Sequence, residues 1–163
     1  MVERTLILIK PDAMKRGLAG TIFSELDGTA ETVGARREVT VDIPTREVTQ
    51  ERLERHYARV IEKYGEPVRK DYIPCLTGKP MILAIYSGPT GTKKAIKEKV
   101  GNTNPKKAEK GTIRGDYGDD DLELSVKERR AVRNLVHATN YKNPEEYDEE
   151  FAVWKDLLHQ LKS

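Results

Sequence analysis

Thr5-Leu6-Ile7-Leu8-Ile9, followed by Lys10-Pro11-Asp12, is the stretch from which the fold of this chain can be inferred. The apolar, β-branched run is long enough for a buried strand and too short for a helix. Pro11 ends it, because proline has no backbone N–H and disfavours a helical conformation of Lys10. A second apolar run, Met81–Tyr86, follows Lys79-Pro80 and predicts another buried strand.

Helical and extended patterns alternate between these two strands. The apolar spacing predicts a helix over Thr21–Leu26 that ends near Gly28, then a strand over Thr32–Val41. Thr49 resembles an N-cap for a further helix over residues 50–63. One side of that helix carries four apolar residues: Leu53, Tyr57, Val60 and Ile61.

The second half of the chain continues the alternation. It predicts a lysine-rich helix over Gly91–Val100, a long ordered loop over Gly101–Asp121, a strand over Val132–Ala138 and a closing helix over Glu145–Leu161. The inward face of the closing helix holds Phe151, Trp154, Leu157, Leu158 and Leu161. This order favours one α+β domain over residues 1–163, a ferredoxin-like sandwich with a four-stranded antiparallel sheet and helices on its face.

The composition narrows the class of protein. The 163 residues fit one domain, and 29 basic against 27 acidic residues give a formal charge of +2, too small to indicate nucleic acid as the main partner. The single cysteine, Cys75, favours a reducing compartment. The sequence has no apolar run of membrane-spanning length, and Met1–Arg4 does not begin a signal peptide, so a cytoplasmic protein with no membrane partner is expected.

Two familiar site patterns do not fit. Gly88–Lys94 faintly resembles a phosphate-binding P-loop, but the spacing is wrong, and a turn before a basic helix is the better interpretation. His56, His137 and His159 are far apart in the sequence and Cys75 has no thiol nearby, so no metal-ligand spacing emerges. His159 is expected at a surface or an interface.

His137 is the strongest candidate for chemistry. A lone histidine beside an apolar strand is more often structural, but Asn134 and Thr139 are polar neighbours that could orient a ring or a ligand. Lys10 ends the first strand, and Thr103 and Arg114 lie in the loop just upstream, so all three could reach the same rim of the sheet. A neutral imidazole can attack a terminal phosphate if cations neutralise the equatorial oxygens.

Six short segments are distributed along most of the chain: Glu3–Asp12, Arg16-Gly17-Leu18, His56-Tyr57, Thr103-Asn104-Pro105, Gly111–Tyr117 and Arg133–His137. In this order they closely resemble the nucleoside diphosphate kinases. The Ile-Lys-Pro-Asp and Gly-Thr-Ile-Arg-Gly-Asp motifs within them are specific.

The resemblance implies a ping-pong transfer of the terminal phosphoryl group from a nucleoside triphosphate, such as ATP, to a nucleoside diphosphate through a phosphohistidine on His137. Glu150 would bond the second nitrogen of His137, and Asn134 would contact the sugar. The phosphates would be held by Lys10, Tyr57, Thr103 and Arg114. Mg²⁺ would arrive on the nucleotide phosphates rather than in a protein site. The family also implies a homo-oligomer, a hexamer or tetramer.

The chain departs from the family pattern in four places. Lys97 stands where the family has an arginine, which loses the bidentate fork for phosphate. Tyr64 is the nearest candidate for the aromatic residue that stacks on the base. Ala138-Thr139-Asn140 replaces Gly-Ser-Asp. An insertion of about ten residues lies within Gly118–Arg130; its Asp119-Asp120-Asp121 run predicts a solvated loop, with an extra metal contact as the alternative.

These departures leave two other functions open. Lys97 and the missing base-stacking aromatic residue suggest a nucleotide-binding regulatory module with little turnover. The set of catalytic and phosphate-binding residues argues against it, because it is complete: Lys10, Tyr57, Arg114, Asn134 and His137. The sequence is also compatible with a protein-histidine phosphodonor that passes the phosphoryl group to a partner protein.

Overall fold

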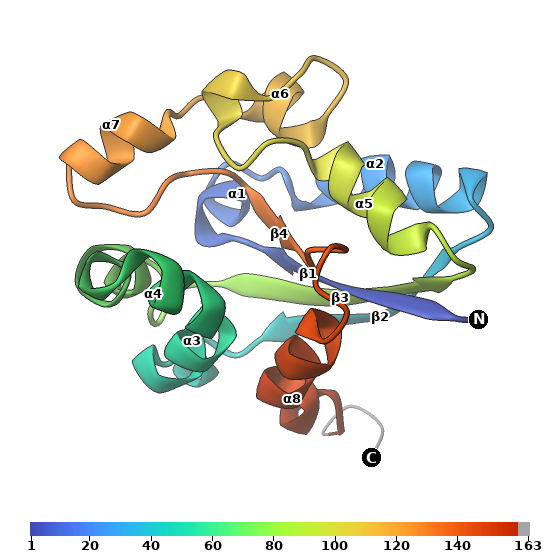
Figure 1. The fold of residues 1–163 in the computed structure, drawn as a ribbon, viewed down its shortest axis with the longest axis horizontal. Helices are drawn as coiled ribbons and strands as arrows, with labels where there is room; N and C mark the ends of the chain where they lie inside the picture. Colours follow the sequence, from blue (N-terminus) through green and yellow to red (C-terminus); the bar gives the residue numbers. More distant parts are fainter. Residues whose placement is uncertain (160–163) are drawn as a thin grey trace.

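The computed structural model describes residues 1–159, which form one antiparallel sheet between two layers of helices (Figure 1). The strands, in the order in which they pair, are β2 (Arg36–Ile43), β3 (Met81–Gly88), β1 (Glu3–Ile9) and β4 (Val136–Ala138). Every pairing is antiparallel. The predicted α+β domain with a four-stranded antiparallel sheet is confirmed.

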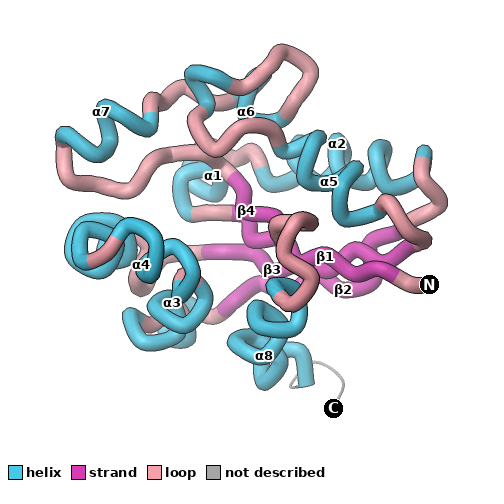
Figure 2. Tube along the Cα trace, in the orientation of Figure 1, coloured by secondary structure: helices cyan, strands magenta, loops and turns pink. Residues whose placement is uncertain are grey.

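Helices cover both faces of this sheet (Figure 2). The sequence predicts helices packed on the sheet, and the structure shows that both faces are covered. The helices are α1 (Pro11–Lys15), α2 (Ala19–Thr32), α3 (Gln50–His56), α4 (Ala58–Tyr64), α5 (Thr92–Val100), α6 (Ile113–Tyr117), α7 (Leu122–Lys127) and α8 (Glu146–His159). Leu6 and Leu8 of β1 pack on one side with residues of α3 and α8, and Ile7 and Ile9 pack on the other with residues of α2 and α5. A strand buried on both faces is apolar at every position, which explains the continuous run of β1.

The register of β1 against β4 positions the candidate site. Leu8 lies opposite His137, and the Lys10 N–H donates to the Leu135 carbonyl oxygen at 2.9 Å, just beyond the end of the ladder. The first strand and the last therefore bring Lys10 beside the segment that carries His137.

Two predicted boundaries in the first half are wrong. The helix expected to end near Gly28 runs on to Thr32, because its buried face continues from Ile22 and Leu26 to Ala30. It ends before Gly34, whose φ of +77° is left-handed and favours glycine. The following strand therefore begins at Arg36 and not at Thr32.

The helix predicted over residues 50–63 is divided at Tyr57, whose ψ of 20° departs from helical geometry. Thr49 caps its start as expected, because the hydroxyl accepts from Arg52 N at 3.1 Å. Leu53, Tyr57 and Ile61 are buried, but Val60 is exposed, so its placement on the buried side was wrong.

The last third is more irregular than predicted. The long loop over 101–121 contains α6, and β4 has only three residues because Leu135 adopts a left-handed φ of +73° that interrupts the extended run. In the closing helix Trp154, Leu157 and Leu158 are buried and Phe151 is partly buried, while Leu161 lies outside the described residues. None of the helices in residues 1–159 has the length and apolar character needed to cross a membrane.

Candidate active site

His137 and Glu150 form the centre of the site. His137 Nε2 lies 2.5 Å from Glu150 Oε2, and the other carboxylate oxygen accepts from the Thr139 hydroxyl at 2.6 Å. The Glu150 side chain is only 4% exposed, whereas that of His137 is 20% exposed. The expected contact between Glu150 and His137 is thus present, and within residues 1–159 no hydrogen bond occupies His137 Nδ1.

The protonation states of this pair follow from burial and nearby cations. Burial, together with Lys97, Arg114 and Lys10, lowers the pKa of His137, so the ring is neutral at pH 7. Burial raises the pKa of Glu150, although its hydrogen bond from Thr139 acts in the opposite direction. A neutral imidazole that donates its Nε2 proton to the carboxylate keeps its lone pair on Nδ1.

Lys10, which follows β1, is fully buried, with 1% of the residue exposed. Its ammonium donates to Asn134 Oδ1 at 2.7 Å, the Tyr72 hydroxyl at 2.8 Å and the Val132 carbonyl oxygen at 3.2 Å. These three acceptors match its three protons, so Lys10 can act on a ligand through its charge without a new hydrogen bond.

Arg114 of α6 is also buried, and its guanidinium spans three backbone carbonyls. Nε donates to Asn134 O at 3.0 Å, one terminal nitrogen to Gly101 O at 3.0 Å, and the other to Val136 O at 2.5 Å. Burial lowers its pKa to about 10, so it remains a cation at neutral pH. Two of its five N–H groups are left for a ligand.

Asn134 joins Lys10 to the loop that carries Thr103. Its amide donates to the Thr103 carbonyl oxygen at 3.0 Å while its Oδ1 accepts from Lys10. The Thr103 side chain is exposed and has no hydrogen bond to another described residue. The structure thus brings Lys10, Asn134 and Thr103 together as expected.

Lys97 of α5 reaches the same strand from the other side. Its ammonium donates to the Ala138 carbonyl oxygen at 3.0 Å, directly after His137. Burial, followed by the charge of Arg114, lowers the pKa of Lys97 to about 8. Lys97 therefore lies close to losing its charge under mildly alkaline conditions.

The two tyrosines predicted for the site differ in position. The Tyr57 ring is buried, its centroid lies 6.4 Å from that of His137, and its hydroxyl has no hydrogen-bond partner in residues 1–159. Tyr64 is 61% exposed, its ring contacts Lys63, and it does not line the cavity beside His137. The structure brings Tyr57 to the site and leaves Tyr64 at its periphery.

Two residues near His137 were missed from the sequence. Tyr72, in the π-helical turn Val68–Tyr72, bonds Lys10 and stacks edge-on with Tyr57 at 5.2 Å between centroids. Arg59 lines the cavity of about 70 Å³ beside His137, and its guanidinium pairs with Glu149 at 2.8 and 2.9 Å. This cavity is too small for a nucleotide, which requires an open cleft. Neither residue belongs to a motif that could have signalled it.

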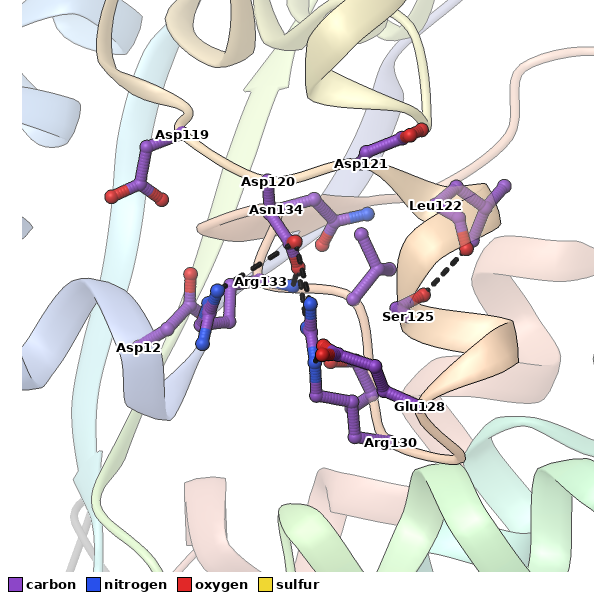
Figure 3. A network of polar contacts seen from close by, with 12 residues as sticks. Asp12, Asp119, Asp120, Asp121, Leu122, Ser125, Glu128, Arg130, Arg133 and Asn134 are labelled. Atoms are coloured by element: carbon purple, nitrogen blue, oxygen red, sulfur yellow. Dashed lines mark hydrogen bonds and ion pairs between the residues drawn. The ribbon is translucent and has the colours of Figure 1, made fainter.

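The insertion between Arg114 and Asn134 is ordered around Asp120 (Figure 3). Asp120 accepts from both terminal nitrogens of Arg130 at 2.7 and 2.8 Å and from Arg133 N at 2.8 Å. Its side chain is 2% exposed, so the prediction of a solvated acidic run was wrong at this position. Arg130 holds the pKa of Asp120 well below its usual range.

The side chains of the acidic run Asp119-Asp120-Asp121 point in different directions (Figure 3). Asp121 caps α7 and accepts from the Asn104 amide at 3.0 Å, and Asp119 is exposed, 3.8 Å from Arg16. They do not form a shared oxygen cage of the kind that Mg²⁺ or Ca²⁺ needs.

Within residues 1–159 one group combines metal-ligand side chains at close range: His56, His137 and Glu150, whose ligand atoms lie within 4.8 Å of one another. The hydrogen bond of His56 excludes a metal there. Trp154 Nε1–H donates to His56 Nδ1 at 3.1 Å, so a neutral His56 carries its own proton on Nε2, the atom that faces the group. A protonated nitrogen has no lone pair for a metal.

Comparisons with known proteins agree with this geometry. The family model described as nucleoside diphosphate kinase matches residues 3–156. A protein named nucleoside diphosphate kinase from Mycobacterium marinum is 36% identical over 155 residues, which cover 94% of this chain and 97% of that protein. The protein of the same name from Chloroflexus aggregans is 33% identical over 153 residues, with 94% and 87% covered.

Solved structures are similar over the same extent. A transition state mimic of nucleoside-diphosphate kinase from Borrelia burgdorferi, with bound vanadate and ADP, has a TM-score of 0.81 at 25% identity and covers 94% of this chain and 86% of its own. A halophilic nucleoside diphosphate kinase from Halobacterium salinarum in complex with CDP has a TM-score of 0.75 at 27% identity, with 94% and 88% covered.

Proposed function

The chain belongs to the nucleoside diphosphate kinase family, and from that premise we propose that His137 Nδ1 carries the phosphoryl group that this enzyme moves from a nucleoside triphosphate to a nucleoside diphosphate. The observation that supports this assignment is the contact of His137 Nε2 with Glu150 at 2.5 Å. With Nε2 engaged, Nδ1 is the nitrogen left to act as nucleophile.

In the first half-reaction the Nδ1 lone pair forms a bond to the γ-phosphorus as the bond from phosphorus to the β–γ bridging oxygen breaks. The nucleoside diphosphate leaves with that electron pair, and the His137 ring gains positive charge. Glu150 orients the ring and stabilises this charge through the Nε2 proton, which stays on the ring. The second half-reaction reverses these steps with another nucleoside diphosphate.

The phosphates would meet a group of cations, of which Lys10 and Arg114 are buried and Lys97 is partly buried. We assign Lys10, Lys97 and Arg114 to charge neutralisation, and Tyr57 and Thr103 to hydrogen bonds with the phosphate oxygens, since the Tyr57 hydroxyl is unpaired within residues 1–159. We propose Mg²⁺ as the divalent metal, bound to the nucleotide phosphates as part of the substrate. The carboxylates of Asp120 and Asp121 already accept hydrogen bonds from Arg130 and Asn104, so they are not free to bind a metal ion in the protein. This supports a metal that arrives with the nucleotide.

For the nucleoside we propose that Asn134 contacts the sugar and that Tyr64 stacks on the base. The exposed ring of Tyr64 supports this, because base stacking needs a free aromatic face. Stacking with few hydrogen bonds to the base edge would give the broad base tolerance expected of this reaction.

We also propose that residues 1–163 form one such domain and that it assembles as a hexamer or tetramer in the cytoplasm. β2 is an edge strand of the sheet, so one side of its backbone is open to pairing with another copy. The single cysteine, Cys75, agrees with a reducing compartment. Analytical ultracentrifugation of the full chain would test the assembly, and a monomer would contradict it.

The phosphohistidine is tested by incubating the protein with ATP and Mg²⁺ and measuring an acid-labile phosphoryl adduct, which GDP should then discharge as GTP. His137→Ala should abolish the adduct and leave ADP binding, measured by calorimetry, within a few-fold of the original protein. An adduct that survives in His137→Ala would place the nucleophile elsewhere.

A further inference from the structure

His56, the last residue of α3, is a buried histidine with no part in the transfer described above. None of its side chain is exposed, and its ring lies edge-on to that of His137, with centroids 4.6 Å apart and an interplanar angle of 77°. Burial, followed by the effect of His137, lowers the pKa of His56 to about 3, so it is neutral at working pH.

Trp154 of α8 sets the tautomer of this ring. An indole nitrogen can only donate, so the 3.1 Å contact from Trp154 Nε1 makes His56 Nδ1 an acceptor and leaves the single proton on Nε2. The same contact blocks a second proton, because a proton on Nδ1 would face the indole N–H. His56 is thus kept as a neutral donor.

The Nε2–H of His56 is directed toward the catalytic pair. It lies 3.9 Å from Glu150 Oε2, the oxygen that contacts His137, and has no hydrogen-bond partner within residues 1–159. A buried N–H without a hydrogen-bond partner destabilises the folded state, because its bond to water is not replaced. Such a donor, 3.9 Å from a carboxylate, forms a proper hydrogen bond after a small movement of the carboxylate or the ring.

We propose, on the basis of the function assigned to His137, that His56 is a positioning residue that holds the Glu150 carboxylate ionised and directed at His137 Nε2 while the His137 ring gains positive charge. A neutral donor can do this without opposing that charge. A cationic histidine at the same place would repel the developing charge and compete for the carboxylate.

The groups that face His56 come from three elements. His137 lies on β4, Tyr57 follows α3 with its ring centroid 4.8 Å away, and Glu150 and Trp154 lie on α8. Four further charged residues line the same cavity as His56 and His137: Glu146 and Glu149 of α8, with Arg55 and Arg59. Glu150 is the one carboxylate of residues 1–159 that lies within 4.0 Å of His56 Nε2, so it is the group that His56 supports.

Two substitutions separate positioning from packing. His56→Gln retains a carbonyl oxygen that can accept from Trp154 and an amide that can donate toward Glu150, whereas His56→Phe fills the space with no polar atom. In single-turnover phosphorylation by ATP, His56→Phe should be roughly tenfold slower, with ADP affinity unchanged, and His56→Gln should recover most of the rate. Equal rates for His56→Phe and the original protein, or equal slowing in both variants, would overturn the proposal.

Trp154→Phe gives an independent test in case the His56 variants fold poorly. Without the indole donor, His56 can accept a second proton, so its pKa should rise and the acid limb of the phosphorylation rate should move to higher pH. Imidazole ¹⁵N shifts of the original protein should show His56 protonated on Nε2 alone; a proton on Nδ1 would refute the proposal. The ¹⁵N measurement needs no phosphoryl transfer. It therefore tests the role of His56 even if His137 forms no phosphoryl adduct.

Discussion

The Thr139 hydroxyl lies 2.6 Å from Glu150 Oε1, on the opposite side of the carboxylate from His137. Thr139 is fully buried and stands at a position where the sequence departs from the family pattern. The hydroxyl holds the second oxygen of Glu150, so the carboxylate is fixed from both ends.

Removal of that hydroxyl should therefore loosen Glu150. Thr139→Val keeps the volume and loses the hydrogen bond, and we expect phosphorylation of His137 to slow by about tenfold and the free energy of unfolding to fall by about 1–2 kcal/mol. Thr139→Ser is the matched control and should stay close to the original protein in both stopped-flow phosphorylation and urea unfolding. Equal rates for the Val and Ser variants would contradict a role for the hydroxyl.

Lys97 should make nucleotide binding depend on pH. Its pKa is lowered to about 8, so the side chain is charged below that pH and neutral above it. Affinity for ADP should weaken as the pH rises through 8, as loss of a cation near phosphate requires. Lys97→Arg should remove this dependence, because guanidinium stays charged.

Calorimetric titrations of ADP between pH 7 and 9.5 would measure the effect. Lys94→Arg, an exchange on the exposed face of α5, serves as the control and should keep the pH dependence of the original protein. If Lys97→Arg keeps it too, the dependence arises from another group.

The Asp120 contacts should stabilise the insertion. Asp120→Asn would leave the partly buried Arg130 with only the exposed Glu128 as a carboxylate partner, and we expect a loss of about 3 kcal/mol in the free energy of unfolding at pH 7. The pKa of Asp120 is lower in the folded state than in the unfolded state, so this stabilisation is present above about pH 4 and is lost as the pH falls below that value.

Urea unfolding at pH 7 and at pH 3 would measure both effects. Asp119→Asn is the matched control, because that side chain is 63% exposed and its ion pair with Arg16 is 3.8 Å long. Its expected cost is below about 0.5 kcal/mol. Equal costs for the two variants would show that burial of Asp120 contributes nothing.

Tyr64 offers a test of the base contact. If it stacks on the base, Tyr64→Ala should lower the affinity for ADP and CDP alike by roughly five- to hundredfold, which corresponds to about 1–3 kcal/mol of stacking. Inorganic tripolyphosphate has no base and should bind both proteins equally. Unchanged nucleotide affinity would assign the base contact to another residue.

The parts that the sequence predicted well depend on local patterns and linear motifs. The apolar runs of β1 and β3 could be recognised because a strand buried on both faces has no polar positions. The contact between His137 and Glu150 could be expected because the resemblance to a known family implies it. His137 ends the last matching segment, and Glu150 stands four residues before Trp154 in the closing helix.

The parts that were missed depend on contacts between distant segments. Tyr72 contacts Lys10 from 62 positions away, in a π-helical turn that no periodicity indicates. Asp120 looked solvated because its neighbours are acidic, and only the chain reversal after α7 brings Arg130 onto it. The left-handed Leu135, which shortens β4, belongs to a residue type that rarely adopts that conformation, so composition gives no warning of it.

The hydrogen bond from Leu6 N to the Thr139 hydroxyl joins residues 133 positions apart. Thr139 directly follows β4, a strand of only three residues. Contacts so distant in the chain form late in folding, after the entropy of closing the intervening loop has been overcome. The same hydroxyl holds Glu150, the carboxylate beside His137. The catalytic pair is therefore in place only when the first strand has met the segment that follows β4.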